Sequence, residues 1–121
     1  MINRQNPTDQ TQLMMLRLLA QRPEIRQRAI SKELGISLGG VNYCIKALVK
    51  KGLVKLDNFG ANKNKVCYLY LLTPAGIALK AQLTAKFLSA KLEEYEALKR
   101  DIDALRREKL DFESSVTNPS I

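Results

Sequence analysis

The chain has 121 residues, 45% of them apolar, which suits one modest domain with an appendage. It has no histidine, no glycine-rich phosphate loop and no cluster of metal-ligating residues, so we expect neither an enzyme nor a cofactor or metal. No apolar run approaches the roughly 18 residues of a membrane span, and two distant cysteines without a signal-peptide pattern predict a reduced, cytoplasmic protein.

The positive charge is concentrated in the first part of the chain. The net charge is +8. Residues 1–76 contain twelve Lys or Arg and four Asp or Glu, whereas residues 77–121 contain eight of each. A polyanionic partner is therefore expected to be attracted to the first part of the chain.

The first predicted element is a helix that is capped by Thr8 or Asp9 and runs to about Gln21. Its leucines and methionines form a broad apolar face. Pro23 stops it, because proline has no backbone N–H to donate. We expect residues 25–26 to form a brief strand before the next helix.

The segment Gln27–Gly52 is typical of a helix-turn-helix. Gly35 stands where the end of a first short helix needs a left-handed residue. The predicted second helix, Ser37–Lys51, starts with a serine suited to be its N-cap. Its apolar residues lie four and three positions apart and share one face, namely Val41, Ile45 and Leu48. The second helix of such a motif enters a DNA major groove, and the alternative is a helical hairpin inside a larger core.

The opposite face of the second helix favours the DNA interpretation. An asparagine amide can read adenine, and a lysine can reach guanine or phosphate. Glycine weakens a helix by roughly 1 kcal/mol relative to alanine, yet it allows close approach to DNA. This candidate base-reading face consists of Leu38, Gly39, Asn42, Tyr43 and Lys46.

A β-hairpin is predicted after Gly52. A short strand is predicted at Leu53–Leu56, and a second at Val66–Leu72, which is rich in β-branched and aromatic residues. The segment 57–65 between them is basic and rich in turn-forming residues. This is the position of the wing in a winged helix-turn-helix, with Lys63 and Lys65 reaching phosphate or an adjacent minor groove. The alternative is an ordinary solvated hairpin loop.

The last predicted element is a long helix from Pro74 or Ala75 to about Glu113. Nearly forty residues without a breaker far exceed an ordinary globular helix, so its apolar stripe needs a partner. A heptad pattern places apolar side chains along its seam, which Lys91 at a d position breaks, and Lys109 occupies an a position. Leu92 beside Lys91 partly compensates. The apolar residues at or beside the seam are Leu88, Leu92, Tyr95, Leu98, Ile102, Leu105 and Phe112.

Charged residues beside the seam favour a parallel homodimer. In a parallel pair, Glu94 lies near Lys99 and Asp101 near Arg106 of the second chain, whereas an antiparallel pair opposes acidic residues. Each exposed pair contributes only about 0.2–1 kcal/mol, so the charges select orientation more than affinity. The alternative is a helix that folds back on its own domain.

The expected fold is therefore mainly α with a small β-hairpin. We predict a winged helix-turn-helix domain over residues 8–73, a coiled-coil dimerisation helix over 74–113 and a disordered tail over 114–121.

Several of these segments resemble the multiple-antibiotic-resistance regulator (MarR) family. They are the run LVKKGLV from Leu48 to Val54, the hairpin, and the step Leu72–Gly76 into the long helix. The run ISLGGVNYCIKALVKKGLVK over residues 36–55 looks closer still to MarR-like regulators associated with exopolysaccharide gene clusters. The resemblance implies that Ser37 contacts bases together with the candidate base-reading face defined above. It also implies that the tip of the wing, residues 63–65, contacts DNA. The arginine that the family has in its wing is missing here. In the family, extra helices at both ends of the chain frame a small-ligand pocket, whereas this sequence predicts one long C-terminal helix. The resemblance therefore leaves open whether a small-molecule effector binds.

The function predicted from sequence is a homodimeric, sequence-specific regulator of transcription on double-stranded DNA with a near-palindromic operator. Phosphate contacts are expected from the basic residues of this part of the chain: Arg26, Arg28, Lys32, Lys50, Lys51, Lys63 and Lys65. The alternatives are a winged helix used for protein assembly and a non-specific nucleoid-binding protein.

The two cysteines have two interpretations. Cys44 lies on the predicted second helix and Cys67 on the second strand, and both are expected to be small buried apolar residues. The alternative is a thiol that senses oxidants.

Overall fold

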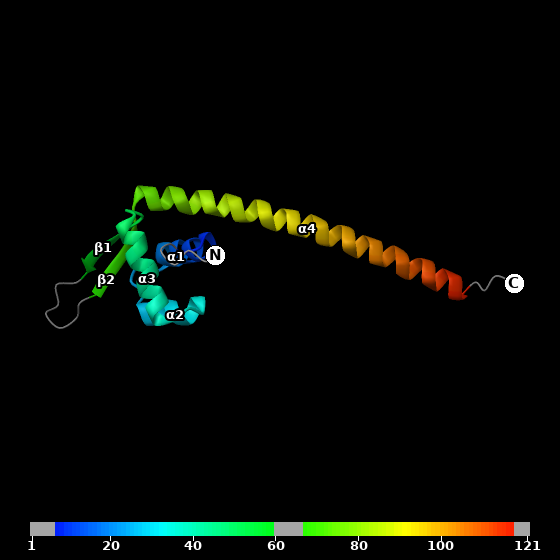
Figure 1. The fold of residues 1–121 in the computed structure, drawn as a ribbon, viewed down its shortest axis with the longest axis horizontal. Coiled ribbons are helices and arrows are strands. Elements are labelled where there is room, and N and C mark those ends of the chain that lie inside the picture. Colours follow the sequence, from blue (N-terminus) through cyan, green and yellow to red (C-terminus); the bar gives the residue numbers. More distant parts are fainter. Residues whose placement is uncertain (1–6, 60–66, 118–121) are drawn as a thin grey trace. The chain divides into compact units, whose positions relative to one another are not determined.

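A computed structural model describes residues 7–59 and 67–117 of the chain. Figure 1 shows the elements in order along the ribbon: α1 (Asp9–Gln21), α2 (Gln27–Leu34), α3 (Leu38–Lys50), β1 (Val54–Phe59), β2 (Cys67–Leu72) and α4 (Pro74–Thr117). The chain divides into two units, residues up to 84 and residues from 85 onward. The predicted fold class, mainly α with a two-stranded hairpin and a long last helix, is confirmed.

The helix α1 begins as its sequence predicts. Thr8 is the N-cap, and its hydroxyl oxygen accepts a hydrogen bond from the Thr11 backbone N–H at 3.2 Å. The buried Gln12 side chain donates its amide N–H to the Pro7 carbonyl at 3.1 Å, so this nitrogen is paired. The apolar face of α1 lies against β2.

A tight turn joins α2 to α3. Gly35 ends α2 with φ 68°, the left-handed conformation that glycine adopts without steric cost. The Ser31 hydroxyl donates to the Ile36 carbonyl across the turn. Ser37 then caps α3, because its hydroxyl oxygen accepts from the Gly40 backbone N–H at 3.0 Å.

The core of the first unit lies where the three short helices meet the hairpin. α3 packs on both α2 and β1. Cys44, predicted to be buried, is 6% exposed within this core. The largest fully buried side chains are Met15, Leu16, Leu19, Ile30, Val41, Leu48 and Val54.

The strands of the hairpin pair antiparallel. Val54 is opposite Leu72, and Leu56 is opposite Tyr70. The strand predicted at residues 25–26 is wrong, because these residues have no strand conformation in the structure. The Tyr70 N–H donates to the nearby Pro23 carbonyl at 2.9 Å, but a single such bond makes no ladder. The predicted wing residues Lys63 and Lys65, and the side chain of Cys67, lie outside the described residues.

The step from the hairpin into α4 is held by a small hydrogen-bond network. The Thr73 hydroxyl oxygen accepts from the Gly76 N–H at 3.1 Å and, as a donor, bonds to the Gly52 carbonyl at 2.5 Å. The Thr73 N–H donates to the Leu53 carbonyl at 3.0 Å. Thr73 therefore caps α4 and ties its first turn to the start of β1.

The second unit is the later part of α4. All its side chains described from Leu88 to Val116 are exposed. The helix continues to Thr117, so the tail predicted to be disordered from Ser114 is helical over 114–117. Neither Ser nor Val stops a helix, and the next breaker is Pro119, which disfavours helix at the residue before it. Among the described residues, no helix combines the length and hydropathy of a membrane span.

Candidate nucleic-acid interface

The helix α3 buries one face and exposes the other. Val41, Ile45 and Leu48 are at most 4% exposed, whereas Leu38 is 45% and Tyr43 43% exposed. Asn42 is half-buried and Lys46 exposed. The predicted base-reading residues therefore lie on the surface of α3, as a DNA-docking helix requires, and their contacts with bases stay a prediction.

Ser37 also has a structural role, in addition to the base contact that the family resemblance implies. Its hydroxyl oxygen holds the first turn of α3 through the Gly40 N–H. The serine is exposed, and its O–H group remains able to donate to a phosphate or a base. Ser37 can therefore cap the helix and contact DNA at the same time.

The two adjacent glycines of α3 differ in their surroundings. A Cβ on Gly39 would meet no atom within 4 Å. A Cβ on Gly40 would lie 3.1 Å from the Ser37 hydroxyl oxygen and 3.5 Å from an Ile36 methyl group. Gly40 is thus explained by packing inside the turn, whereas only Gly39 presents an open patch of backbone on the exposed face.

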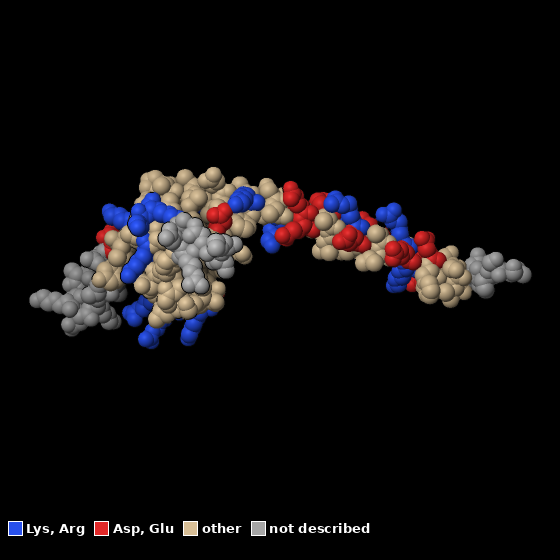
Figure 2. Space-filling model, viewed as in Figure 1, with Lys and Arg blue, Asp and Glu red and all other residues tan. Residues whose placement is uncertain are grey.

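Basic side chains gather on the first unit (Figure 2), whereas the second unit carries both signs along its helix. Glu33, an acidic residue of α2, is paired with Arg22. The described members of the predicted phosphate-binding set are all exposed: Arg26, Arg28, Lys32, Lys50 and Lys51. Their exposure suits binding to a polyanion.

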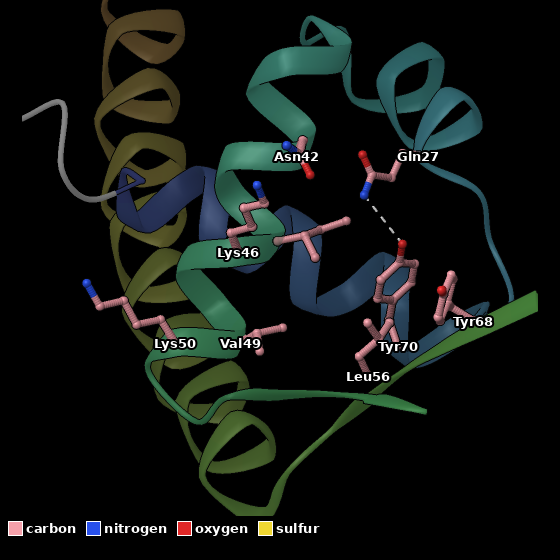
Figure 3. A pocket seen from close by; sticks show the side chains of 9 residues that line it. Gln27, Asn42, Lys46, Val49, Lys50, Leu56, Tyr68 and Tyr70 are labelled. Carbon is pink, nitrogen blue, oxygen red and sulfur yellow. Dashed lines mark hydrogen bonds between the residues drawn. The ribbon is translucent and has the colours of Figure 1, made fainter. Parts of the chain in front are cut away.

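A pocket of about 440 Å³ lies between α3 and the hairpin, and Figure 3 shows its walls. It is lined by Gln27, Asn42, Ile45, Lys46, Val49, Lys50, Leu56, Tyr68 and Tyr70. Two of these, Asn42 and Lys46, were predicted to read bases, and Lys50 to bind phosphate. The sequence analysis gave none of the others a functional role, although the alternation along the hairpin could have indicated that Leu56, Tyr68 and Tyr70 share one face.

Cys44 is a buried thiol beneath the exposed face of α3. Burial raises the pKa of this thiol, because the charged thiolate loses its hydration there. A raised pKa lowers the reactive thiolate fraction, which agrees with a packing role. Among the described residues, no group of three or more acidic or sulfur ligands could hold a metal ion.

The second unit presents an exposed apolar stripe that is interrupted at two seam positions, Lys91 and Lys109. The seven predicted seam residues are between 40% and 68% exposed, with Ile102 the least and Phe112 the most. Val116, 60% exposed, falls one heptad beyond Lys109 and extends the stripe past the predicted end of the helix. An apolar stripe this long is typical of an interaction surface.

Comparison with known proteins supports the architecture. Residues 8–55 match a family model described as winged helix-turn-helix DNA-binding. A search of curated proteins found no match.

Solved structures share the fold. The adhesin competence repressor AdcR of Streptococcus pyogenes is 24% identical with a TM-score of 0.61, over 97% of this chain and 83% of that one. ZitR of Lactococcus lactis, solved in complex with DNA, is 24% identical with a TM-score of 0.59, over 96% and 77%. A MarR-family transcriptional regulator of Rhodococcus sp. RHA1 is 19% identical with a TM-score of 0.60, over 91% and 74%. The chain is therefore a winged helix-turn-helix protein with the fold of the MarR-family regulators.

Proposed function

We propose that the protein is a homodimeric, sequence-specific regulator of transcription that binds double-stranded DNA. The observation that carries this proposal is the exposed face of α3, where Leu38, Asn42, Tyr43 and Lys46 stand on a helix whose other face is in the core. The match of residues 8–55 to DNA-binding domains and the DNA complex of the similar ZitR support it.

In this proposal α3 lies in the major groove. The Asn42 amide pairs with adenine N6 and N7, and the Leu38 side chain contacts a thymine methyl group. Gly39 lets the backbone of the first turn approach the base edges. α3 has no arginine, and Lys46 is the cation of the proposed base-reading face, so it is the residue that would contact guanine O6 and N7.

Most of the affinity comes from phosphate contacts. The exposed cations of α2 and of the end of α3 lie on the charged unit, and segment 57–65 adds Lys63 and Lys65 by sequence. Neutralising phosphates releases counterions, so binding weakens steeply as salt rises.

The second copy of this chain is the proposed partner of the second unit. Its seam positions follow a heptad from Leu88 to Val116 and are apolar except at Lys91 and Lys109, which suits self-association in a coiled coil. Parallel pairing opposes Glu108 to Glu113 of the second chain. Lys109 offsets this, because its ammonium group lies 3.8 Å from the Glu113 carboxylate on the same helix.

A two-fold dimer implies a two-fold target. The operator is then a near-palindrome whose half-sites lie about 10 bp or a multiple of this apart. We propose that the protein acts at the chromosome in the cytoplasm, and the resemblance of residues 36–55 makes exopolysaccharide genes the first candidates.

A mobility-shift assay with genomic fragments, repeated across salt concentrations, tests the proposal. We expect a few fragments to be retained at least 10³-fold more tightly than the rest, in line with specific DNA binding, and all retention to fall with salt. Footprints on the retained fragments should show two related half-sites. Retention without fragment preference would instead support a non-specific nucleoid-binding protein, and no retention an assembly module.

A further inference from the structure

We propose that two lysines of the second unit, Lys91 and Lys109, restrict its self-association to two chains in a single register. This inference rests on the homodimer of the proposed function and names the residues that decide how the two copies pair. It concerns residues 85–117 alone, so the mass and the register of the assembly test it without DNA.

The two lysines interrupt an otherwise apolar seam. Lys91 occupies a d position and Lys109 an a position of the heptad that runs from Leu88 to Val116. Their side chains are 71% and 75% exposed in the single chain. A lysine at a seam position lowers the stability of a coiled coil, but it also specifies the register and the number of strands.

Each seam lysine has an ion-pair partner on the flank of its own helix. The Lys91 ammonium group lies 3.3 Å from the carboxylate of Glu94, a g residue, and the Lys109 ammonium group lies 3.8 Å from that of Glu113, an e residue. Each lysine can therefore bury its methylene stem in the seam and keep its charge at the hydrated edge. A third or fourth helix would cover this edge, and burying the ammonium group there is costly.

The apolar residues alone determine the number of chains less sharply. Ile102 and Val116 at a positions, with Leu98 at d, favour two strands. Leu92, however, lies at an e position and is 54% exposed, so it widens the apolar stripe beyond the seam. Lys91 stands directly beside this wider part, where a third helix would otherwise pack.

The register follows from what each lysine faces. In register, Lys91 and Lys109 each face the same residue of the second chain. A shift of one heptad sets Lys91 against Leu98, and Lys109 against Ile102 in one layer and Val116 in another, so the number of seam layers that contain a lysine doubles. The shift also removes the two-fold symmetry and leaves an unpaired end on each chain, to which further chains can add.

The lysines do not select the orientation of the helices. An antiparallel pair centred on Arg100 also sets Lys91 against Lys109, because both lysines are equally far from Arg100. That pair opposes Glu94 to Glu108, two acidic g residues, so the flanking charges disfavour it. The charges therefore select the parallel orientation, and the lysines select the register and the number of chains.

Sedimentation equilibrium of the full chain measures the number of chains. Wild-type protein should reach the mass of two chains and no more, whereas Lys91→Leu/Lys109→Leu should form trimers or tetramers. The matched control, Arg100→Leu/Arg107→Leu, makes the same changes in charge and apolar surface at f positions, opposite the seam, and should stay at two chains. Circular dichroism shows that each variant remains helical. The mass of two chains for the double lysine variant would overturn the proposal.

Disulfide exchange measures the register. Leu98→Cys and Leu105→Cys chains, in a Cys44→Ala/Cys67→Ser background, are mixed in a glutathione buffer. In-register pairs join like chains, and a slip of one heptad joins position 98 to position 105. Like pairs should exceed mixed pairs by more than about tenfold with both lysines present and by less than about twofold after Lys91→Leu/Lys109→Leu. An unchanged ratio would overturn the proposal.

These results separate this inference from the proposed function. If wild-type protein stays a single chain, both the homodimer and this inference fail. If the lysine variant changes mass and register as expected but wild-type protein retains no genomic fragment, DNA binding fails and the role of the lysines stands. If DNA is retained and the lysine variant pairs as wild type does, only this inference fails.

Discussion

Gly76 lies against the carbonyl group of Leu53. A Cβ placed on Gly76 would stand 2.0 Å from the Leu53 oxygen and 3.0 Å from its carbonyl carbon. The same oxygen accepts the Thr73 N–H, so the Leu53 backbone is fixed where the first turn of α4 passes. No side chain can move aside here, because the obstructing atoms are backbone.

Gly76→Ala should therefore destabilise the first unit by about 1–3 kcal/mol, the usual cost of overpacking. Urea unfolding followed by circular dichroism measures it. Ala78→Gly, two residues later on the exposed side of α4, is the matched control for helix propensity and should cost at most about 1 kcal/mol. An unchanged unfolding midpoint in Gly76→Ala would contradict the close contact.

Gly39→Ala should have the opposite effect on stability. Its added methyl group meets no atom within 4 Å, and alanine favours a helix by about 0.5–1 kcal/mol over glycine. The same methyl group stands on the proposed DNA face, so operator affinity should fall while unfolding shifts to higher urea. A variant that is both more stable and bound as tightly as wild type would show that Gly39 does not approach DNA.

Asn42→Ala and Lys51→Ala should weaken DNA binding in different ways. Loss of the amide should cost about 1–3 kcal/mol on the operator and relax discrimination at one base pair. Loss of the Lys51 ammonium should weaken all sequences alike and lower the salt slope by about 1. Titrations of operator and random DNA at several salt concentrations measure both, and an equal loss on random DNA would mean that Asn42 does not read a base.

Leu98→Glu should dissociate the proposed dimer. Leu98 is a seam residue that is 58% exposed in the single chain, and burial of one leucine contributes about 1.5–3 kcal/mol. Leu110→Glu is the matched control, since Leu110 is 63% exposed but lies off the seam. Light scattering should give the mass of one chain for the first variant and two for the second. Equal masses for the two variants would contradict the heptad assignment.

Cys44 should react slowly with iodoacetamide in the folded protein. Burial raises the pKa of its thiol, so the folded state holds the proton to higher pH than the unfolded state does. Stability from the neutral thiol is complete below the ordinary thiol pKa and decreases as pH rises through the raised one. In a Cys67→Ser background, alkylation should be faster in urea than in buffer at every pH. Equal rates would mean that the thiol is not buried.

Much of this fold could be predicted from sequence because its signals are local. The Thr8 and Ser37 caps and the left-handed Gly35 each depend on residues within one turn. The predicted strand at residues 25–26 was wrong because strand formation depends on a partner ladder, which a short sequence pattern does not reveal. The helix continues to Thr117, beyond its predicted end, because the mainly polar residues 114–117 contain no breaker and the next one is Pro119.

The candidate site was predictable only in part. Helical periodicity placed Leu38, Tyr43 and Lys46 on the exposed face of α3. The alternation along the hairpin could have placed Tyr68 on its inner face, but the pocket itself and the position of Gln27 in it were not predictable, because they depend on how far the hairpin extends beyond the helices. The separate roles of the two glycines also required the three-dimensional surroundings of each.

If the exposed apolar stripe of the second unit forms the proposed dimer, the amount of dimer depends on the concentration of the protein. Single helices are marginally stable in water, so in the proposed dimer the ordering of residues 85–117 and the meeting of two chains are one mass-action event. A fall in gene dosage then lowers the concentration of the proposed dimer more than proportionally. If the proposed dimer is the form that binds DNA, the number of copies of the chain alone sets how much of the proposed operator is occupied.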